Sequence, residues 1–355
     1  MAFTGGIQSS VCLHWLAHSG EYRVSAFAAN LGQPGKLRRF GEHALPLGAD
    51  KAHLEDVRDE FCRHYVLPAL KAGVVYGNSY LLSGALARPL IADVLVRLAE
   101  EEAVTCVAHG AGPQSSDLAR FEQCVAALAP DMELLGPGQV PPLQSRQDAV
   151  EYARKKDIMP DEQLAPALHM DRNLWGRAVE VDPMMDTGDE LPECVYELTE
   201  DPRQAPDEPE RVKIRFEQGE PVSIDGRELD LKALIGELNE RAGRHGIGRT
   251  QVIEDSVSGI KARQVYERPA AEVLTEAHGA LEEMVLDYPT LELKKQLARN
   301  YGQVVYRGSW FSPLKDALDA FFDSTQEHMT GEATVELHRG SARVVGRSSP
   351  NSLYD

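Results

Sequence analysis

The sequence lacks several features that would tie it to an oxidising compartment, a membrane or a nucleic acid. Its five cysteines contain no CxxC pair and no metal-ligand spacing, so we expect reduced cysteines in a cytosolic core and no protein metal site. Lys and Arg number 37 against 56 Asp and Glu, and the formal net charge of −19 argues against nucleic acid or an anionic membrane as a partner. We find no signal peptide and no uncharged apolar run of membrane-spanning length, and we expect a cytoplasmic protein.

The length of 355 residues is enough for two domains. In the first half, short apolar strands alternate with amphipathic helices, which predicts a doubly wound parallel sheet with ligands beyond the carboxyl ends of its strands. Only residues 1–3 precede the loop that holds the first glycine pair, so either the first strand is a stub or the chain begins late. The predicted strands are 24–28, 52–54, 105–108 and 133–135, and the predicted helices are 57–72, 88–102, 117–129 and 145–156.

The second half has a different pattern, typical of an α+β domain. A hairpin is expected around the Asp225-Gly226 turn and another around Arg339-Gly340. We place the domain boundary between residues 158 and 171, which gives a nucleotide-binding domain over 1–165 and a second domain over 166–355. The predicted strands are 194–200, 212–217, 222–227, 333–338 and 342–345, and the predicted helices are 230–242, 270–286, 291–302 and 313–330.

A glycine loop near the start indicates phosphate chemistry. Gly5 and Gly6 let backbone N–H groups face an anion, and Ser9 or Ser10 is expected to cap the apolar helix that follows. A Gly-Gly turn that opens a helix also occurs with a purely structural role. No lysine follows the glycines, so this is not the Gly-Lys-Ser/Thr loop of nucleoside triphosphatases. The loop is similar to the pyrophosphate loop of ATP-pyrophosphatases, which split ATP between its α- and β-phosphates.

Longer stretches along the whole chain resemble the argininosuccinate synthase family. The resemblance implies an ATP-pyrophosphatase-like domain followed by a synthetase domain. It also implies a ligation that uses ATP with Mg²⁺: citrulline's ureido oxygen attacks the α-phosphorus, and the amine of aspartate then displaces AMP. The matching stretches are 80–89, 108–110, 120–122, 171–175, 193–209, 244–249, 259–263, 265–267, 310–313 and 344–354.

The resemblance also implies which residues form the site. Asp117 would hold an amine, and Arg120 would neutralise a carboxylate or the ureido oxygen, so these two carry the catalytic role. His109 is expected to shape its loop. The nucleotide-binding residues would be Thr4, Gly5, Gly6, Ser9, Ser10, Ala29 and Gly110. The substrate-binding residues would be Tyr80, Arg88, Gly112, Ser116, Asp117, Arg120, His169, Glu254 and Tyr266.

The sequence departs from the family pattern mainly at ligand positions. A family aspartate is Gln8 here, a threonine is Gly112, a lysine is Gln114 and an asparagine is Ser116. Each lost hydrogen-bond donor to a charged group costs about 1–3 kcal/mol. We therefore predict an AMP-forming carbon–nitrogen ligase with an altered substrate pair. The alternatives are a genuine argininosuccinate synthase and a non-catalytic nucleotide-binding paralogue. Three family serines are replaced by Ala85, His169 and Ala178.

The substitution at His169 has two interpretations. Its imidazole is suited to an anionic or aromatic substrate group, or to act as a base. It also fits a histidine that replaces a serine without a role.

The assembly is predicted from the resemblance as well. Family members form tetramers through a C-terminal helical arm after a Ser-Leu-Tyr sequence, and this chain stops one residue beyond its own Ser352-Leu353-Tyr354. We expect a homo-oligomer smaller than a tetramer, with a dimer favoured, acting on small amino-acid-like substrates.

Overall fold

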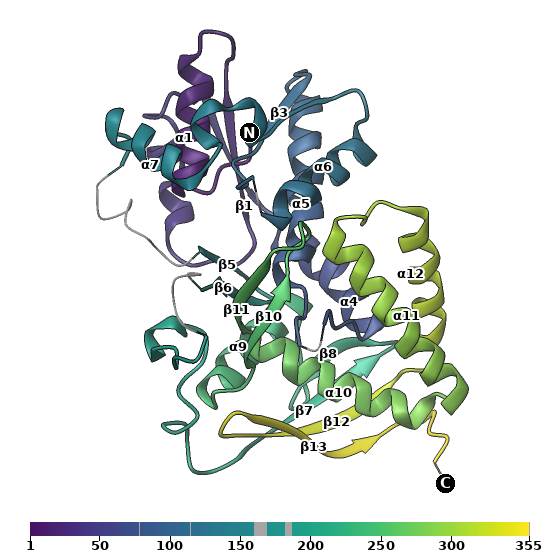
Figure 1. Ribbon diagram of the computed structural model, residues 1–355. Coiled ribbons are helices and arrows are strands. Elements are labelled where there is room, and N and C mark those ends of the chain that lie inside the picture. Colours follow the sequence, from purple (N-terminus) through teal and green to yellow (C-terminus); the bar gives the residue numbers. More distant parts are fainter. Residues whose placement is uncertain (78, 114, 160–168, 182–186, 355) are drawn as a thin grey trace.

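The computed structural model describes residues 1–77, 79–113, 115–159, 169–181 and 187–354 (Figure 1). In the first half two parallel strand pairs form, β1 (Ser25–Asn30) with β2 (Lys51–Asp56) and β3 (Cys106–Ala108) with β4 (Glu133–Leu135). Ala2 makes parallel bridges to both Phe27 and His109. Residues 1–3 therefore act as a short strand between β1 and β3, and the sheet accommodates this stub.

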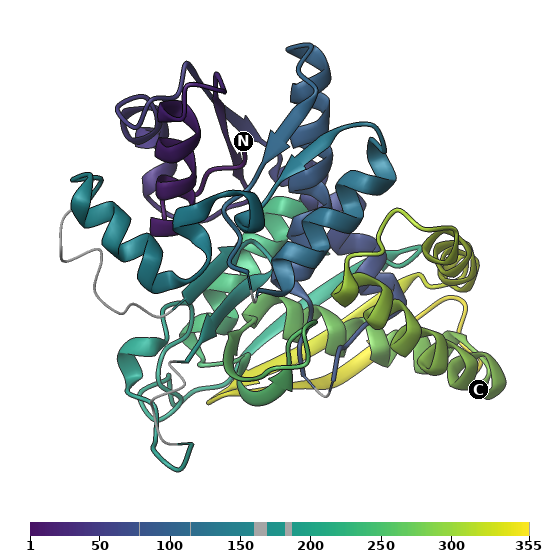
Figure 2. The same cartoon turned by 45° about the horizontal axis from the view of Figure 1, so that its top comes forward.

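Helices cover both faces of this sheet, as Figure 2 shows. Side chains alternate along β1: Ala26 and Ala28 pack in one apolar cluster with α1 (Ile7–His18), and Phe27 and Ala29 pack in the other with α5 (Ser83–Glu101). This arrangement confirms the predicted doubly wound α/β half. The remaining elements are η1 (Lys36–Arg39), α2 (Phe40–Ala44), α3 (Arg58–Phe61), the π-helical turn η2 (Cys62–Val66), α4 (Leu67–Ala72), α6 (Ser116–Leu128), η3 (Pro137–Gln139), η4 (Pro141–Leu143) and α7 (Arg146–Lys155).

The second half contains two antiparallel sheets. One has five strands in the order β13-β12-β7-β8-β9, and its apolar face packs against α9 (Leu231–Arg244) and α10 (Pro269–Val285). The predicted turn is present: Asp225 and Gly226 have φ values of 50° and 82°, as a tight hairpin requires. The strands are β7 (Glu210–Glu217), β8 (Glu220–Ile224), β9 (Arg227–Glu228), β12 (Gly331–His338) and β13 (Ser341–Ser348), with α11 (Tyr288–Arg307) and α12 (Pro313–Gln326) beside them.

The other sheet, in the order β10-β11-β6-β5, was not predicted from the sequence. It lies between the first half and the five-stranded sheet (Figure 1). Strand β10 reads Arg-Thr-Gln-Val-Ile-Glu-Asp, which has too few apolar residues for a usual strand pattern; this sheet borders a cavity whose lining includes several charged side chains. The strands are β5 (His169–Asn173), β6 (Gly176–Glu180), β10 (Arg249–Asp255) and β11 (Lys261–Glu267).

The strand predicted over 194–200 is wrong. The segment forms a short turn, η5 (Glu193–Val195), and then an irregular path. The N–H groups of Glu197, Leu198 and Thr199 donate to the buried Glu267 carboxylate at 2.8–3.0 Å instead of to a neighbouring strand. Arg177 neutralises that carboxylate at 2.7 Å. The buried Glu267 carboxylate therefore accepts the N–H hydrogen bonds that a neighbouring strand would accept in a sheet.

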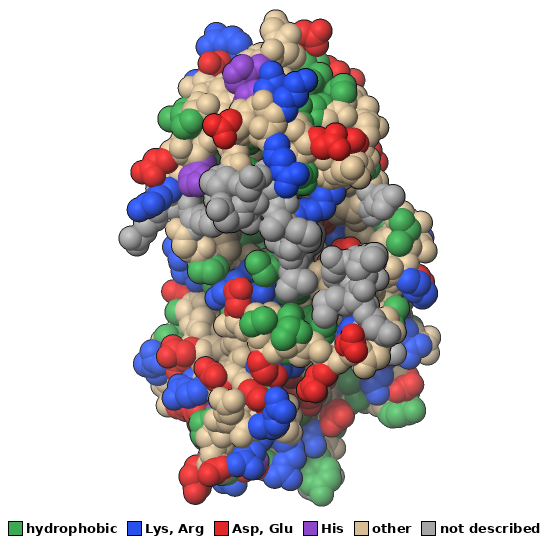
Figure 3. All heavy atoms as spheres, turned by 60° about the vertical axis from the view of Figure 1, so that its left-hand side comes forward, with side chains coloured by type: hydrophobic (Ala, Val, Ile, Leu, Met, Phe, Trp, Pro, Cys, Tyr) green, Lys and Arg blue, Asp and Glu red, His purple; other side chains and the backbone are tan. Residues whose placement is uncertain are grey.

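The surface agrees with the composition. On the face in Figure 3, the described Lys and Arg side chains are interspersed with Asp and Glu. Among the described helices, none is both long and apolar enough to cross a membrane.

Candidate active site

The glycine loop opens α1 at the sheet's ligand-binding edge. Gly5 has a φ of +76°, which favours glycine, and Gly6 is the N-cap residue of α1 without a side-chain cap. The first-turn N–H groups of the helix have no partner within the helix and carry its partial positive charge. The loop is therefore suited to bind phosphate oxygens.

The predicted capping role of Ser9 and Ser10 is wrong. The helix begins at Ile7, so both serines lie inside its first turn, where they are buried. The Ser9 hydroxyl donates to the Gly6 carbonyl at 3.0 Å and accepts from the Thr4 N–H at 3.3 Å. These bonds fix the shape of the loop and leave the helix N–H groups for a ligand.

The loop after β3 packs directly on the start of α1. A Cβ at Gly110 would lie 2.7 Å from Ser9 Cα and 2.8 Å from Ser9 N, so only glycine allows this approach. His109 is buried with its ring stacked on Phe121, and its Nδ1 accepts from the Ala111 N–H at 3.1 Å. Burial lowers the pKa of His109 to about 4, so it is neutral at pH 7. His109 thus shapes the loop, as expected from the sequence.

Two of the sequence departures contact each other. A Cβ at Gly112 would lie 2.8 Å from Nε2 of Gln8, so the Gln8 side chain fills the space beside position 112. The glutamine and the glycine are therefore fitted to one another. Gln114, another departure in the loop after β3, lies outside the described residues.

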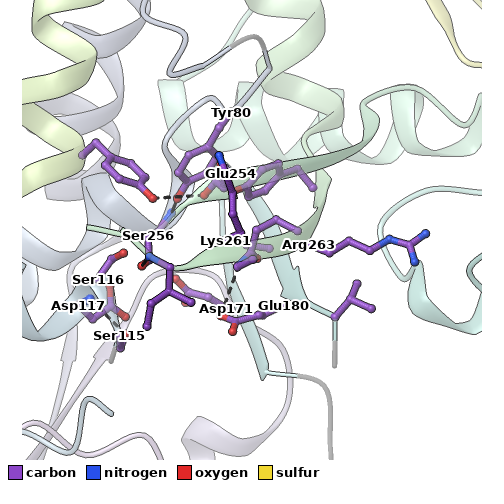
Figure 4. A pocket seen from close by; sticks show the side chains of 18 of the residues that line it. Tyr80, Ser115, Ser116, Asp117, Asp171, Glu180, Glu254, Ser256, Lys261 and Arg263 are labelled. Carbon is purple, nitrogen blue, oxygen red and sulfur yellow. Dashed lines mark hydrogen bonds between the residues drawn. The ribbon is translucent and has the colours of Figure 1, made fainter. Parts of the chain in front are cut away.

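A cavity of about 390 Å³ lies where the two halves meet, between α5, α6, β6, β10, β11 and α11. Gly112, the glycine loop, Ala29 and Gly110 are not among its lining residues, and the side chain of His169 is not described. In Figure 4, Ser115, Ser116 and Asp117 lie together at one side of it. The cavity brings together the predicted substrate residues Tyr80, Arg88, Ser116, Asp117, Arg120, Glu254 and Tyr266.

A chain of ion pairs forms one wall. Arg88 donates to Asp117 and to Asp171, both at 2.8 Å, and Arg120 donates to the other oxygen of Asp117 at 2.8 Å. Burial acts to raise the pKa of Asp117, but the two guanidinium groups outweigh it and hold that pKa well below its usual range. Asp117 is therefore ionised and held between two arginines, which is a more rigid arrangement than the surface pair that its spacing from Arg120 suggests.

Aromatic rings and one carboxylate form the opposite wall. The rings of Tyr80 and Tyr266 stack at 4.3 Å, and the Tyr80 hydroxyl accepts from the Gly84 N–H at 3.0 Å. Burial raises the pKa of Glu254, while hydrogen bonds from Tyr266 and Tyr306 act in the opposite direction. The cavity thus offers guanidinium groups on one side and a carboxylate on the other.

Ser116 contributes to the geometry in an unexpected way. Its hydroxyl accepts from the N–H of Val257 at 3.0 Å, in the turn between β10 and β11. Ser115, immediately before it, is the N-cap residue of α6 and accepts from the Asp117 N–H at 3.1 Å. Ser116 therefore joins the two halves at the cavity.

Several residues that line the cavity were not predicted as site residues from the sequence. Asp171, Lys261 and Arg263 line the cavity and lie in stretches that matched the family, and this match is the feature of the sequence that could have identified them as site residues. Arg263 points away from the cavity in Figure 4 and donates to the Asp189 carbonyl at 2.9 Å. Tyr306 lies on an amphipathic helix, where an aromatic residue gives no functional signal.

The residues present fit ATP better than they fit a protein-bound metal. Free helix N–H groups and the glycines suit the phosphates. For Mg²⁺, the loop offers the Thr4 hydroxyl and the Gln8 amide, both neutral, whereas Mg²⁺ prefers carboxylate and phosphate oxygens. Among the described residues, no group of three His, Cys, Asp or Glu side chains is placed to hold a metal ion. The loop therefore does not itself form a magnesium site.

Comparisons with known proteins cover the whole chain. Residues 1–159 match the arginosuccinate synthase N-terminal HUP domain, and residues 168–355 match the arginosuccinate synthase C-terminal domain. The argininosuccinate synthase of Carboxydothermus hydrogenoformans is 44% identical over 354 residues, which cover 100% of this chain and 88% of the relative. That of Pelotomaculum thermopropionicum is 44% identical over 355 residues, again 100% of this chain and 88% of the relative.

These matches explain the architecture. The doubly wound half is a HUP domain of the ATP-pyrophosphatase type, which implies the use of ATP, and the half with antiparallel sheets is the synthase domain. The chain therefore belongs to the argininosuccinate synthase family, whose members are ATP-dependent ligases that form a carbon–nitrogen bond.

Proposed function

We propose that this protein joins citrulline to aspartate with release of AMP and pyrophosphate. The observation that carries the proposal is the convergence of Tyr80, Arg120, Glu254 and Tyr266 on one cavity, which presents both charges that a zwitterionic acceptor needs. Relatives 44% identical over the whole chain are named argininosuccinate synthase. They favour the ordinary substrate pair over the altered pair that the departures at the site predicted.

In the first step, the α1 N–H groups and the glycine loop hold the phosphates of ATP. The ureido oxygen of citrulline attacks the α-phosphorus, the bond from that phosphorus to the α,β-bridging oxygen breaks, and pyrophosphate leaves. Arg120 donates Nη1 to Asp117 and Nε to the Tyr306 carbonyl. Among the described residues no hydrogen bond uses its Nη2, which is therefore available to the acceptor. The protein contributes orientation and charge neutralisation.

In the second step, the ammonium of aspartate loses a proton to water and the resulting amine attacks the ureido carbon. The bond from that carbon to the ureido oxygen breaks, and AMP leaves with the oxygen. Asp117 keeps its negative charge because Arg88 and Arg120 depress its pKa. A carboxylate has about four lone-pair sites, so Asp117 can accept from a substrate ammonium while it keeps both arginines. Arg88 fixes the direction of Asp117 from α5, which pre-organises this contact.

A second candidate is the same ligation with a different amine. The specific observation in its favour is the contact between Gln8 and Gly112, since position 112 offers no side-chain donor and the neighbouring glutamine fills its space. An amine substrate with a smaller or less acidic side chain would suit that loop.

Release of AMP and pyrophosphate with different amines separates the two candidates. With citrulline and aspartate we expect turnover of about 1 s⁻¹ or more, which is ordinary for an enzyme. An inert reference pair, together with turnover of citrulline and another amino acid, would favour the second candidate. Absence of ATP binding at millimolar nucleotide would contradict both.

A Gly6→Val variant tests whether the glycine loop binds the nucleotide. A Cβ at Gly6 would meet nothing closer than Thr4 Oγ1 at 3.5 Å, so the fold tolerates a side chain there. The added atoms block the approach of phosphate to the helix N–H groups, and we expect ATP binding to be lost while the melting temperature is retained.

A further inference from the structure

Tyr306 lies at the end of α11, next to both charged walls of the cavity. It is buried and lines the cavity. Its contacts run to α6 on one side and to β10 on the other.

On the α6 side, Tyr306 holds Arg120 in two ways. Its carbonyl accepts from Arg120 Nε at 2.9 Å, and the guanidinium carbon lies 4.9 Å from the centre of its ring. The end of α11 is shaped for this approach: Gly308 has a φ of +87°, and a Cβ there would lie 2.6 Å from Arg120 Cα. The helix end therefore fixes the backbone, the side-chain direction and the charge environment of Arg120.

On the β10 side, Tyr306 holds the strand that carries Glu254. Its hydroxyl donates to the Asp255 carbonyl at 2.7 Å and lies 3.4 Å from Glu254 Oε1. The short bond fixes the backbone directly after Glu254, and the longer contact faces the carboxylate itself.

The ring of Tyr306 has little freedom to move. It stacks on Tyr76 at 3.7 Å with an interplanar angle of 5°, and it meets the Tyr80 ring edge-on at 6.4 Å. Because the ring is held rigidly and contacts both α6 and β10, it fixes the positions of these two elements relative to each other.

We propose that Tyr306 is a positioning residue that sets the separation and orientation of Arg120 and Glu254, and so determines how tightly the acceptor is bound. This rests on the proposed function only in assuming that these two side chains contact the acceptor. It does not depend on which amine is the second substrate.

The test uses Tyr306→Phe, which keeps the ring, the stacking and the backbone carbonyl and removes only the hydroxyl. We expect the KM for citrulline to rise by about fivefold to tenfold, the usual consequence of losing one hydrogen bond. The KM for ATP is expected to stay within twofold, because the glycine loop is not involved. If Tyr306 had only a structural role, Tyr306→Phe would change the thermal stability but would not raise the KM for citrulline more than the KM for ATP.

Tyr76→Phe is the matched control. Its ring belongs to the same stack, but among the described residues no hydrogen bond of its hydroxyl is present, and it does not line the cavity. We expect both KM values to match the wild type. If Tyr76→Phe raises the citrulline KM as much as Tyr306→Phe does, loosening of the stack explains the effect and the proposal is wrong.

A second readout does not require activity. The groups that face Glu254 are Tyr266, Tyr306, Tyr76, Tyr80, Arg120 and Asp255. Of these, Tyr306→Phe removes the hydroxyl whose 3.4 Å contact with Glu254 lowers the pKa of that carboxyl, so the pKa of Glu254 is expected to rise. The measurement is a carbon-13 NMR titration of glutamate-labelled protein, with Glu254→Gln to assign the signal.

The two readouts separate failure of this proposal from failure of the proposed function. If wild-type protein does not turn over citrulline with any amine, the proposed function fails, and the titration still tests the contact of Tyr306 with Glu254. If Tyr306→Phe leaves both the citrulline KM and the Glu254 pKa at wild-type values, Tyr306 is a core residue and the inference is overturned.

Discussion

Replacing Asp117 with asparagine tests whether the buried ion pairs hold the site together. Asp117 accepts from Arg88 and from Arg120 at 2.8 Å, and its side chain is only 17% exposed. Removing the charge leaves two buried guanidinium groups facing a neutral amide. Breaking a buried pair costs about 3–5 kcal/mol. Since the amide oxygen still accepts one hydrogen bond, we expect a loss of about 2–4 kcal/mol in the free energy of unfolding at pH 7.

The matched control is Asp171→Asn. Asp171 pairs with the same Arg88 at the same 2.8 Å, but no second arginine of the described residues pairs with it, and its side chain is 30% exposed. Solvent screening reduces the value of such a pair, so we expect a loss of about 1 kcal/mol or less. Urea unfolding of both variants and of the wild type gives the comparison directly.

The pH dependence gives an independent check. Because the pKa of Asp117 is lower in the folded protein than in the unfolded chain, its charge stabilises the fold above the unfolded value of about 3.9. That stabilisation decreases as the pH falls from this unfolded value toward the lower pKa that Asp117 has in the folded protein. The stability gap between wild type and Asp117→Asn is therefore expected to narrow between pH 5 and pH 3. A cost no larger than that of Asp171→Asn, or a gap that widens in acid, would refute the reasoning.

Three further substitutions follow from the loop contacts. Gly110→Ala places a Cβ against the Ser9 backbone, so we expect ATP affinity to fall at least tenfold by calorimetry; unchanged affinity would mean that the loop can move. Gly112→Thr places a side chain against Gln8, so we expect this variant to have a lower melting temperature than the wild type. Adding Gln8→Ala to it is expected to restore the melting temperature; if the single and double variants melt at the same temperature, the two positions are not coupled. Ser116→Ala removes the acceptor for the Val257 N–H, and we expect a cost of about 1 kcal/mol in unfolding, whereas no cost would show that this link between the halves is unimportant.

The first half of the fold could be predicted because its strand β1 is buried on both faces and its helices are amphipathic. β1 and its helices have a plain apolar pattern, and this pattern decides the element type. The sheet of β10 and β11 borders the cavity, so its inward side chains are polar and the alternation that would reveal it is lost. At 194–200 the alternation was present, but the Glu267 carboxylate takes the N–H groups that a strand would use.

The site was predicted through the resemblance, and only in part. Tyr80, Arg120, Glu254 and Tyr266 do meet in one cavity. The network around them depends on residues distant in sequence, such as Asp171 beside Arg88 and Tyr306 beneath Arg120. Neither contact has a local signal, because each depends on how the two halves are placed against each other.

The most direct test of the central claim follows one oxygen atom. Citrulline labelled with oxygen-18 in its ureido group is incubated with ATP, aspartate and the protein, and the AMP is analysed by mass spectrometry. If the ureido oxygen attacks the α-phosphorus, the label appears in the phosphate of AMP, one atom for each AMP formed. AMP formed without label would show that another group attacks ATP, and the account given for this site would be wrong.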